Sequence, residues 1–290
     1  MIVIDTDPGL DDAIAILYAL RSGQPVGAIT TVAGNIGLEV TTRNALRLAA
    51  LAGAEVPVHP GAARPMAGTS RFETAIHGDD GLGGVAVPDP DRSASAEAAG
   101  AALVRLIGAH PPGAVTLYCL GPMTNLARLV RDAPEAARRL GPVIAMGGAV
   151  DEPGNVGPRA EFNLAHDPQA AGIVLAAGLD LTLIPLDATR RLRADRAYLE
   201  ALRATGTVAA TTSAALIEAY FASTSGGESR PLHDPCVPLL HARPGLFEIE
   251  TRALDVDAEG ALVPGPHAVR VAMGLDAGAL REELRAGLAA

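Results

Sequence analysis

Four aspartates stand close together near the start of the chain, in the stretch DTDPGLDD at residues 5–12. Carboxylates this close in a partly buried place repel one another or take up protons, so they need a positive counter-charge. The first arginine is Arg21, and the whole chain contains no lysine. A metal ion is therefore the simplest partner, and a ligand set made only of oxygen atoms favours Ca²⁺ or Mg²⁺ over zinc.

The residues of this stretch are also compatible with two alternatives to a metal site of this kind. Asp11 and Asp12 would be favourable in the first turn of a helix, near the positive end of its dipole. A helix dipole leaves Asp5 and Asp7 unaccounted for. These two have the DxD spacing of a haloacid-dehalogenase-type phosphotransferase, in which one acid is a nucleophile and Mg²⁺ is the metal. The phosphate-binding lysine of such enzymes cannot occur in this chain.

The composition narrows the classes of function. A net charge of −10 and a pI near 5.1 argue against nucleic acid or an anionic membrane as partner, because both attract clustered positive charge. With 290 residues, 49% of them hydrophobic, we expect residues 1–290 to form a single domain. Cys119 and Cys236 form no CxxC pattern, so neither a disulfide nor a zinc site is indicated. We see no signal peptide or membrane-spanning run, and we expect a cytoplasmic protein.

Short apolar runs alternate with Ala- and Leu-rich stretches along most of the chain. Strands are predicted at residues 1–4, 26–32, 56–61, 114–121, 142–150 and 179–187. Helices are predicted between them, including a single helix over 124–140, whereas the last third has a more irregular pattern. Strands that are apolar on both faces indicate a parallel sheet covered by helices. We therefore predict an α/β fold with an open, mostly parallel sheet, helices on both faces and a Rossmann-like core.

Such a fold indicates where function should lie. In open α/β sheets, ligands bind outside the carboxyl ends of the strands, so the loops that follow strands are the places to examine. The segments with suitable polar residues are DTDPGLDD at 5–12, LGPMTN at 120–125, the stretch 146–163, and HDP at 233–235.

These segments, with TVAGN at 31–35, HGDDGLGG at 77–84, MGGAV at 146–150 and EFN at 161–163, resemble the motifs of the nucleoside hydrolase family, the inosine-uridine-preferring nucleoside N-ribohydrolases. The resemblance covers nearly the whole chain. It implies a nucleoside hydrolase-like fold and the hydrolysis of ribonucleosides to free base and ribose, in nucleoside salvage. It also implies Ca²⁺ as the cofactor and a homodimer or homotetramer as the assembly.

The resemblance further implies a metal site and the residues that activate water. Asp7, Asp12 and Asp234 would bind Ca²⁺ through their carboxylates, and Leu120 would bind it through its backbone carbonyl. Asp7 would also take the proton of the attacking water. Asn35 would orient Asp7, although an asparagine after glycine is commonly just a turn residue.

The remaining roles concern the substrate. His233 would be the acid that helps the base to leave, and its alternative is an ordinary loop histidine that steadies Asp234. Surplus carboxylate at Asp5, Asp7, Asp11 and Glu161 would stabilise a ribosyl cation. The side chains that would bind the ribose hydroxyls are Asp11, Asn155, Glu161 and Asn163. Further substrate contacts would be His77, beside the nucleobase, Met146 and Phe162.

Some of these residues could have simpler roles. Asn155 could be only a turn residue, and Glu161 and Asn163 could cap a helix that begins near Asp167. Base preference stays open, because some relatives place a tyrosine over the base in the segment that corresponds to 220–234, and here Ser and Gly occupy the nearest positions. A non-catalytic calcium- or nucleoside-binding protein of the same fold is a further alternative.

Overall fold

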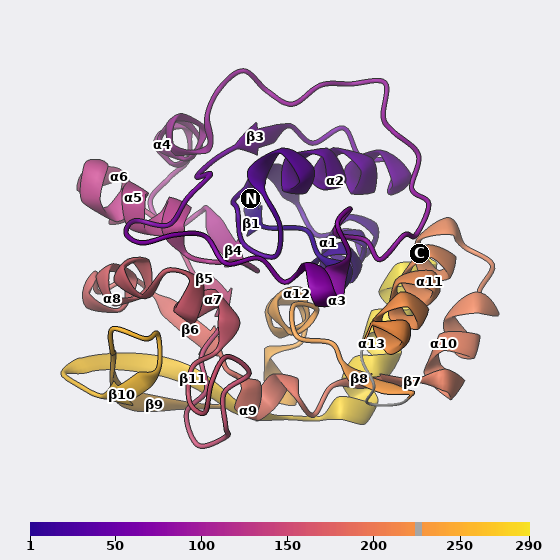
Figure 1. Cartoon of the computed structure of the whole chain (residues 1–290). Helices are drawn as coiled ribbons and strands as arrows, with labels where there is room; N and C mark the ends of the chain where they lie inside the picture. The colour runs from indigo at the N-terminus through magenta and orange to yellow at the C-terminus, as the bar shows by residue number, and fades with distance from the viewer. Residues whose placement is uncertain (224–227) are drawn as a thin grey trace.

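The computed structural model describes residues 1–223 and 228–290, which form a layered α/β structure. In these residues, the centre is an open sheet of nine strands in the order β10-β9-β11-β6-β5-β4-β1-β2-β3. Helices cover both faces of the sheet (Figure 1). The prediction of an α/β fold with an open, mostly parallel sheet is confirmed.

Every neighbouring pair of strands from β3 to β11 is parallel, whereas β9 pairs antiparallel with both β11 and β10. The strands of this sheet are β1 (Ile2–Thr6), β2 (Val26–Thr31), β3 (Val58–Pro60), β4 (Thr116–Cys119), β5 (Val143–Met146), β6 (Leu181–Ile184), β9 (Phe247–Val256), β10 (Leu262–Pro264) and β11 (His267–Leu275). A separate antiparallel pair consists of β7 (Arg193–Asp195) and β8 (Ser229–Pro231).

The helices connect these strands. They are α1 (Leu10–Arg21), α2 (Leu38–Leu51), α3 (Thr74–His77), α4 (Ala99–Ala109), α5 (Thr124–Asp132), α6 (Pro134–Ala137), α7 (Phe162–His166), α8 (Pro168–Ala176), α9 (Leu186–Thr189), α10 (Arg196–Arg203), α11 (Val208–Ala222), α12 (Cys236–Ala242) and α13 (Ala277–Ala289). A single 3₁₀ turn, η1, spans Pro244–Leu246.

The strands are apolar on both faces because each face supports its own core. In β1, Ile2 and Ile4 pack with α1, α2 and α11 to α13, whereas Val3 points to the other face, toward α4, α5 and α8. Figure 1 shows these two groups of helices on opposite sides of the sheet. Burial on both faces is the reason that the strands are apolar throughout.

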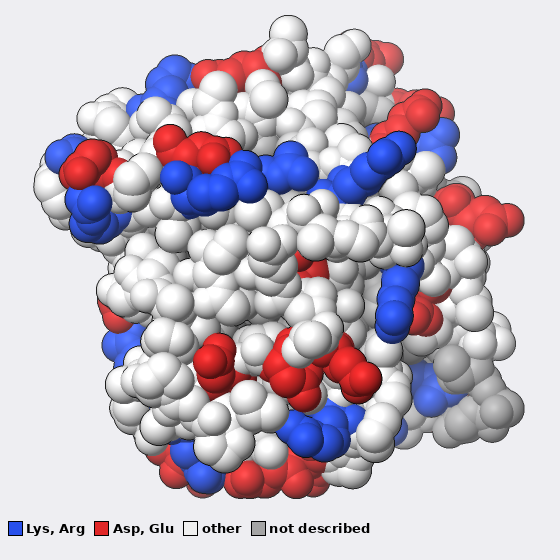
Figure 2. Space-filling model, turned by 60° about the vertical axis from the view of Figure 1, so that its left-hand side comes forward, with Lys and Arg blue, Asp and Glu red and all other residues white. Residues whose placement is uncertain are grey.

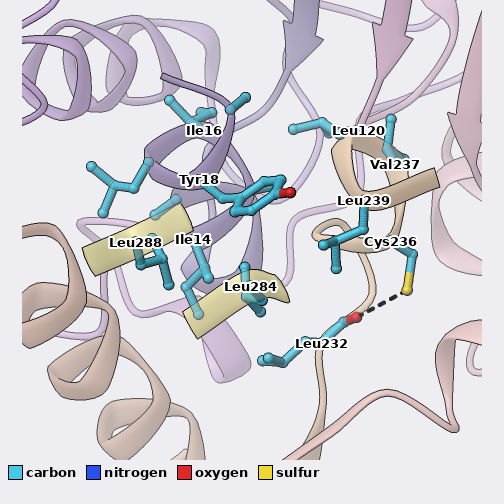
Figure 3. Close-up of a cluster of buried hydrophobic side chains, with 14 of the residues drawn as sticks. Ile14, Ile16, Tyr18, Leu120, Leu232, Cys236, Val237, Leu239, Leu284 and Leu288 are labelled. Atoms are coloured by element: carbon cyan, nitrogen blue, oxygen red, sulfur yellow. Dashed lines mark hydrogen bonds between the residues drawn. The ribbon is translucent and has the colours of Figure 1, made fainter. Parts of the chain in front are cut away.

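One of these cores holds the segments that matter for function. Figure 3 shows Ile14 and Tyr18 of α1, Val237 and Leu239 of α12, and Leu284 of α13 gathered between the helices. The acidic stretch 5–12 runs into the first turn of α1, and α12 directly follows the HDP segment. Their shared core therefore keeps the two segments at the same end of the sheet.

Two predictions about individual elements are wrong. The helix expected over 124–140 is divided into α5 and α6, because Pro134 has no backbone N–H with which to continue α5. The irregular C-terminal part contains β9, β10 and β11, which extend the sheet. Most residues of β9 are partly or fully exposed, so its sequence lacks the apolar run by which the other strands were recognised.

Two further observations concern the charged surface and the helices. On the face drawn in Figure 2, basic side chains form a row across the upper half with acidic side chains beside them, and a further acidic group lies in the lower half. Among the described helices, none combines the length and the apolar character needed to cross a membrane.

Candidate active site

The loops that follow β1, β4 and β5 meet at one end of the sheet because these strands are adjacent and parallel. They border a small pocket, with a volume of about 110 Å³. The residues that line it are Asp11, Asn35, Glu73, Ile76, His77, Leu120, Met146, Asn155, Val156, Glu161, Phe162, Asn163, Tyr220, His233 and Asp234. Every residue expected to bind substrate is among them.

Asp7 lies directly after β1 and is completely buried. Its Oδ2 accepts a hydrogen bond of 2.6 Å from the backbone N–H of Asn35. Its Oδ1 has no hydrogen-bond partner in the part of the chain that the structure describes. A Cβ atom at Gly34 would lie 2.0 Å from Oδ2, and one at Gly121 would lie 2.0 Å from Oδ1. The carboxylate of Asp7 thus fits between two glycines, and Asn35 makes the contact that its predicted orienting role requires.

Asp12 is tied to the same residues from the other side. Its carboxylate accepts hydrogen bonds from Thr6 Oγ1 at 2.6 Å, from the Gly9 N–H at 3.0 Å and from Asn35 Nδ2 at 3.0 Å. The bond from Gly9 caps the start of α1. Asp12 therefore lies in the first turn of a helix, as the alternative to a metal site expected. Because Asn35 binds both Asp7 and Asp12, the relative position of the two carboxylates is set by one side chain and its backbone.

Carboxylates from distant segments gather here. One oxygen each from Asp11, Asp12 and Asp234 lies within 4.8 Å of the others. Asp7 is not part of this compact group, and its Oδ2 is bound to Asn35 instead. Burial raises the pKa of Asp234 well above its ordinary value, and the charges of Asp11, Asp12 and Asp7 raise it further. Burial, followed by the charge of Asp12, raises the pKa of Asp7 in the same direction.

This arrangement fits a divalent cation. Buried carboxylates would otherwise have to take up protons, since the pocket is lined by no Arg in the described residues and the chain has no lysine. The buried Oδ1 of Asp7 still needs a partner. All the donors are oxygens, which suits Ca²⁺ or Mg²⁺ better than zinc.

Like Asp7 and Asp12, Asp5 does not line the pocket. Its Oδ1 accepts hydrogen bonds from Thr30 Oγ1 at 2.5 Å and Asn125 Nδ2 at 2.7 Å. Burial raises its pKa to about 6, although both hydrogen bonds oppose the rise. A hydroxyl and an amide therefore bind Oδ1 of Asp5 and link β1 to β2 and α5, whereas its buried Oδ2 has no hydrogen-bond partner among the described residues.

Leu120 is buried immediately after β4 and presents its backbone carbonyl toward the stretch EFN. That carbonyl accepts a hydrogen bond of 2.8 Å from Asn163 Nδ2, which also lies 3.2 Å from the carbonyl oxygen of Met146. Asn163 thereby connects the ends of β4 and β5. Its side chain does not cap a helix, so that alternative is wrong for Asn163.

Glu161 does cap a helix, although not the expected one. Its carboxylate accepts hydrogen bonds from the N–H groups of Asn163 at 2.9 Å and Gly148 at 3.0 Å, and it precedes α7. Asp167 is the cap of the next helix, α8. Burial raises the pKa of Glu161 to about 7, although the backbone hydrogen bonds oppose the rise. Asn155 accepts a hydrogen bond of 2.9 Å from the first residue of α7, so both side chains shape the wall of the pocket.

His233 is held at both its ring and its backbone. Its Nδ1 lies 2.7 Å from the hydroxyl oxygen of Thr189, and its N–H donates to Asp11 Oδ2 at 3.3 Å. Burial lowers the pKa of His233 to about 4, and the charges of Arg190 and Arg193 act in the same direction. The ring is thus neutral at neutral pH, and it faces the pocket as the predicted role requires.

His77, the last residue of α3, contacts the start of α1. Its Nδ1 accepts a hydrogen bond of 3.0 Å from the N–H of Leu10, so the ring proton is on Nε2. Burial lowers its pKa, and the charges of Asp11 and Asp12 oppose this. This hydrogen bond connects α3, and the loop that contains it, to the acidic stretch at residues 5–12.

Sequence reasoning missed four residues that line the pocket. They are Glu73, Ile76, Val156 and Tyr220. Ile76 is next to His77 and Val156 is next to Asn155. Their position beside these predicted residues is the only feature of the sequence that could have identified them. Tyr220 lies four residues before the segment 224–227, which lies outside the described residues.

The chain is similar along most of its length to known hydrolases. The model of the inosine-uridine preferring nucleoside hydrolase family matches residues 2–282. The chain is 37% identical over 270 residues to the pyrimidine-specific ribonucleoside hydrolase RihA of Enterobacter sp. (strain 638), covering 91% of this chain and 86% of that protein. It is 35% identical over 274 residues to the non-specific ribonucleoside hydrolase RihC of Salmonella enteritidis PT4, covering 93% and 87%.

Solved structures agree. A plant nucleoside hydrolase, the PpNRh1 enzyme, superposes with a TM-score of 0.94 at 32% identity, covering 100% of this chain and 98% of that one. The purine-preferring ribonucleoside hydrolase from Gardnerella vaginalis superposes with a TM-score of 0.92 at 29% identity, covering 99% and 98%. The sequence motifs, the fold and these similarities lead to one conclusion: the chain belongs to the inosine-uridine preferring nucleoside hydrolase family and is an N-glycosyl hydrolase.

Proposed function

We propose that this protein hydrolyses the N-glycosidic bond of ribonucleosides in a Ca²⁺-dependent reaction and releases the free nucleobase and ribose. The observation that carries the proposal is the group of buried carboxylates of Asp11, Asp12 and Asp234, of which Asp11 and Asp234 line the pocket. Polar side chains suited to ribose hydroxyls and apolar side chains suited to a flat base line the same pocket. A nucleoside needs both, because its ribose is polar and its base is flat and largely apolar on its faces.

In this proposal Asp7, Asp12, Asp234 and the carbonyl of Leu120 hold Ca²⁺. The cation supplies a Lewis acid for a water molecule and for the ribose hydroxyls. Support comes from the unpartnered Oδ1 of Asp7 and from a donor set made only of oxygens. The carbonyl of Leu120 accepts one hydrogen bond from Asn163, and a second lone pair is left for a cation.

Asp7 is the base of the proposed reaction. Its Oδ2 is bound to the N–H of Asn35, so Oδ1 is the atom that takes the proton of the attacking water. The water oxygen bonds to C1′ of the ribose, and the electron pair of the C1′–N bond moves to the departing base. Asn35 also binds Asp12, so it holds the carboxylate of Asp7 in a constant position relative to that of Asp12.

Positive charge develops on the ribose as this bond breaks, and the pocket suits that charge. Asp11 and Glu161 line it, and no Arg of the described residues does. A preorganised negative field of this kind stabilises an oxocarbenium-like ribose. The N–H of His233 that Thr189 does not contact then donates to the departing base, and this ring nitrogen takes a proton back from solvent, so that the neutral ring is restored.

A panel of purine and pyrimidine ribonucleosides, assayed for reducing sugar with and without a chelator, tests the proposal. Release of ribose that stops in chelator and returns with Ca²⁺ is the expected result. No release of ribose from any ribonucleoside contradicts it. Cleavage of p-nitrophenyl phosphate in place of p-nitrophenyl riboside would favour the phosphotransferase, and nucleoside binding without turnover would favour the non-catalytic alternative.

The proposal also covers the location, the domain organisation and the assembly of the enzyme. We expect a cytoplasmic protein whose residues 1–290 form a single domain, supported by a sheet that contains both β1 and β11 from opposite parts of the chain. We also expect a homodimer or homotetramer. Light scattering on purified protein tests this, since the chain has a mass of 29.5 kDa.

A further inference from the structure

Glu73 lines the pocket, yet the reaction proposed above does not use it. It stands immediately before α3, and its backbone N–H donates a hydrogen bond of 2.9 Å to the carbonyl oxygen of Asn35. Asn35 also binds Asp7 and Asp12. The position of Glu73 is therefore set relative to the carboxylates at the bottom of the pocket.

The carboxylate of Glu73 is an acceptor without a matching donor from the protein. Among the described residues, no Arg forms an ion pair with it and none lines the pocket, and the chain has no lysine. Burial raises the pKa of Glu73, and no neighbouring charge contributes to the shift. The donor that this carboxylate needs has to come from a bound molecule or from solvent.

The depth of the pocket determines which part of a nucleoside reaches Glu73. Asp7, Asp12 and Asp234 are at most 4% exposed, whereas Glu73 is half-buried. A ribose that reaches the buried acids leaves its base toward the mouth, with the Watson–Crick edge outermost. Glu73 and Ile76 are three residues apart in the turn of α3 and share a face, so the carboxylate stands beside an apolar wall suited to a flat ring.

We infer that Glu73 selects the nucleobase and that guanine is the base it recognises best. This inference rests on the proposed hydrolysis of ribonucleosides. An ionised carboxylate offers two acceptor oxygens and no donor. On its Watson–Crick edge, guanine presents two adjacent donors, N1–H and the 2-amino group, which match the two oxygens of the carboxylate.

The other common bases match less well. Hypoxanthine has N1–H beside a C–H, and uracil has N3–H between two carbonyl oxygens. Adenine and cytosine place a ring-nitrogen acceptor next to their amino group, which repels the second oxygen of a carboxylate. Bidentate hydrogen bonds to a charged acceptor are stronger than single or neutral ones. Guanosine and inosine differ only in the 2-amino group, so this pair isolates the contribution of Glu73.

The experiment compares kcat/KM for guanosine and inosine in the parent enzyme, Glu73→Gln and Glu73→Ala. We expect the parent to favour guanosine by about 10-fold or more. Both variants should bring the ratio to within about 2-fold of unity, mainly through a higher KM for guanosine. Glu73→Gln keeps the size and one acceptor oxygen, but its amide donor faces the donors of guanine. Thermal unfolding of both variants shows that they are folded.

Asp79→Ala is the matched control, because it removes an exposed carboxylate from the neighbouring loop without changing the lining of the pocket. Its guanosine-to-inosine ratio should equal that of the parent. Equal kcat/KM for the two nucleosides in the parent, turnover of pyrimidine nucleosides alone, or an unchanged ratio in both Glu73 variants would overturn the role of Glu73 while nucleoside hydrolysis stands. A parent protein inactive on every nucleoside would refute the proposed function as well.

Discussion

The hydroxyl oxygen of Thr189 lies 2.7 Å from Nδ1 of His233, and this contact joins α9 to the segment that contains Asp234. The ring is neutral at neutral pH, since burial lowers its pKa to about 4. A neutral imidazole carries one proton, on the nitrogen that its neighbours select. When the hydroxyl donates to Nδ1, the proton is on Nε2, which is the tautomer that the proposed role of His233 requires.

Thr189→Val removes this hydroxyl and keeps the shape of the side chain. We expect kcat for inosine or uridine to fall about 10-fold, while p-nitrophenyl riboside, whose phenolate needs little protonation, is hydrolysed at nearly the parental rate. Thr189→Ser keeps the hydroxyl and should retain activity on both substrates. Equal losses on the nucleoside and on p-nitrophenyl riboside would assign the contact to folding rather than to proton transfer.

Asp7→Asn removes the proposed base and keeps the size of the side chain. Turnover should fall by about 10²–10⁴-fold while nucleoside binding, measured by calorimetry, is largely retained. Asp5→Asn is the matched control, because Asp5 is an equally buried aspartate two residues earlier that contacts Thr30 and Asn125 instead of Asn35. Its Oδ1 can still accept from Thr30 and Asn125, so turnover should stay within a few-fold of the parent. A strong loss in Asp5→Asn would restore the electrostatic role expected from the sequence.

Removal of the metal should lower stability as well as activity, since buried carboxylates lose their counter-charge. In excess chelator we expect turnover to disappear and the Tm to fall, with Ca²⁺ restoring both. The measurement is thermal unfolding in parallel with the reducing-sugar assay. Full activity in chelator, in a preparation shown by elemental analysis to be metal-free, would count against the metal site.

The effect of Ca²⁺ on Tm should depend on pH. In the metal-free protein, burial raises the pKa values of Asp7 and Asp234 well above 3.8. The folded state therefore binds more protons than the unfolded state above about pH 4, and stability declines as pH rises through the raised pKa values. A cation needs the deprotonated carboxylates. We expect the rise in Tm with Ca²⁺ to be larger at about pH 8 than at about pH 5.5, and the opposite order would contradict this assignment.

Deoxynucleosides should be poor substrates, because the polar side chains around the pocket are assigned to ribose. Without the 2′-hydroxyl, a carboxylate or amide among Asp11, Asn155, Glu161 and Asn163 is left unpaired. Sites built to bind a hydroxyl reject its absence by about 10⁴–10⁵-fold. Deoxyribosyl bonds break more easily in water, so chemistry alone predicts the reverse order. Comparable kcat/KM for uridine and 2′-deoxyuridine would show that these four residues do not bind ribose.

Gly121→Ala tests the space around Asp7. The new Cβ would lie 2.0 Å from Asp7 Oδ1, so the carboxylate has to move. A displacement of about 1 Å in a catalytic group costs about 100-fold in rate, which is the expected loss of kcat. Gly172→Ala in α8 is the control, since no atom lies within 4 Å of its Cβ, and it should retain activity and gain about 0.5–1 kcal/mol of stability.

The sequence by itself determined the features that depend on neighbours along the chain. The alternation of apolar strands with amphipathic helices predicted the layered fold, because each strand is buried on both faces by whatever helices follow it. The acidic stretch after β1 predicted an oxygen-only site for the same local reason. The resemblance of several segments to family motifs also identified residues that line the pocket, including Asp11 and Asp234.

The tertiary structure decided everything that depends on contacts between distant segments. Asp5 and Asp7 are two residues apart and look equivalent in the sequence, yet the chain leaves the strand between them, and Asp5 contacts Thr30 whereas Asp7 contacts Asn35. Glu73 carries no motif, and the bond from its N–H to the carbonyl of Asn35 ties it to a residue far from it in the sequence. Pairing between remote strands and packing between remote helices set such contacts, and no spacing along the chain encodes them.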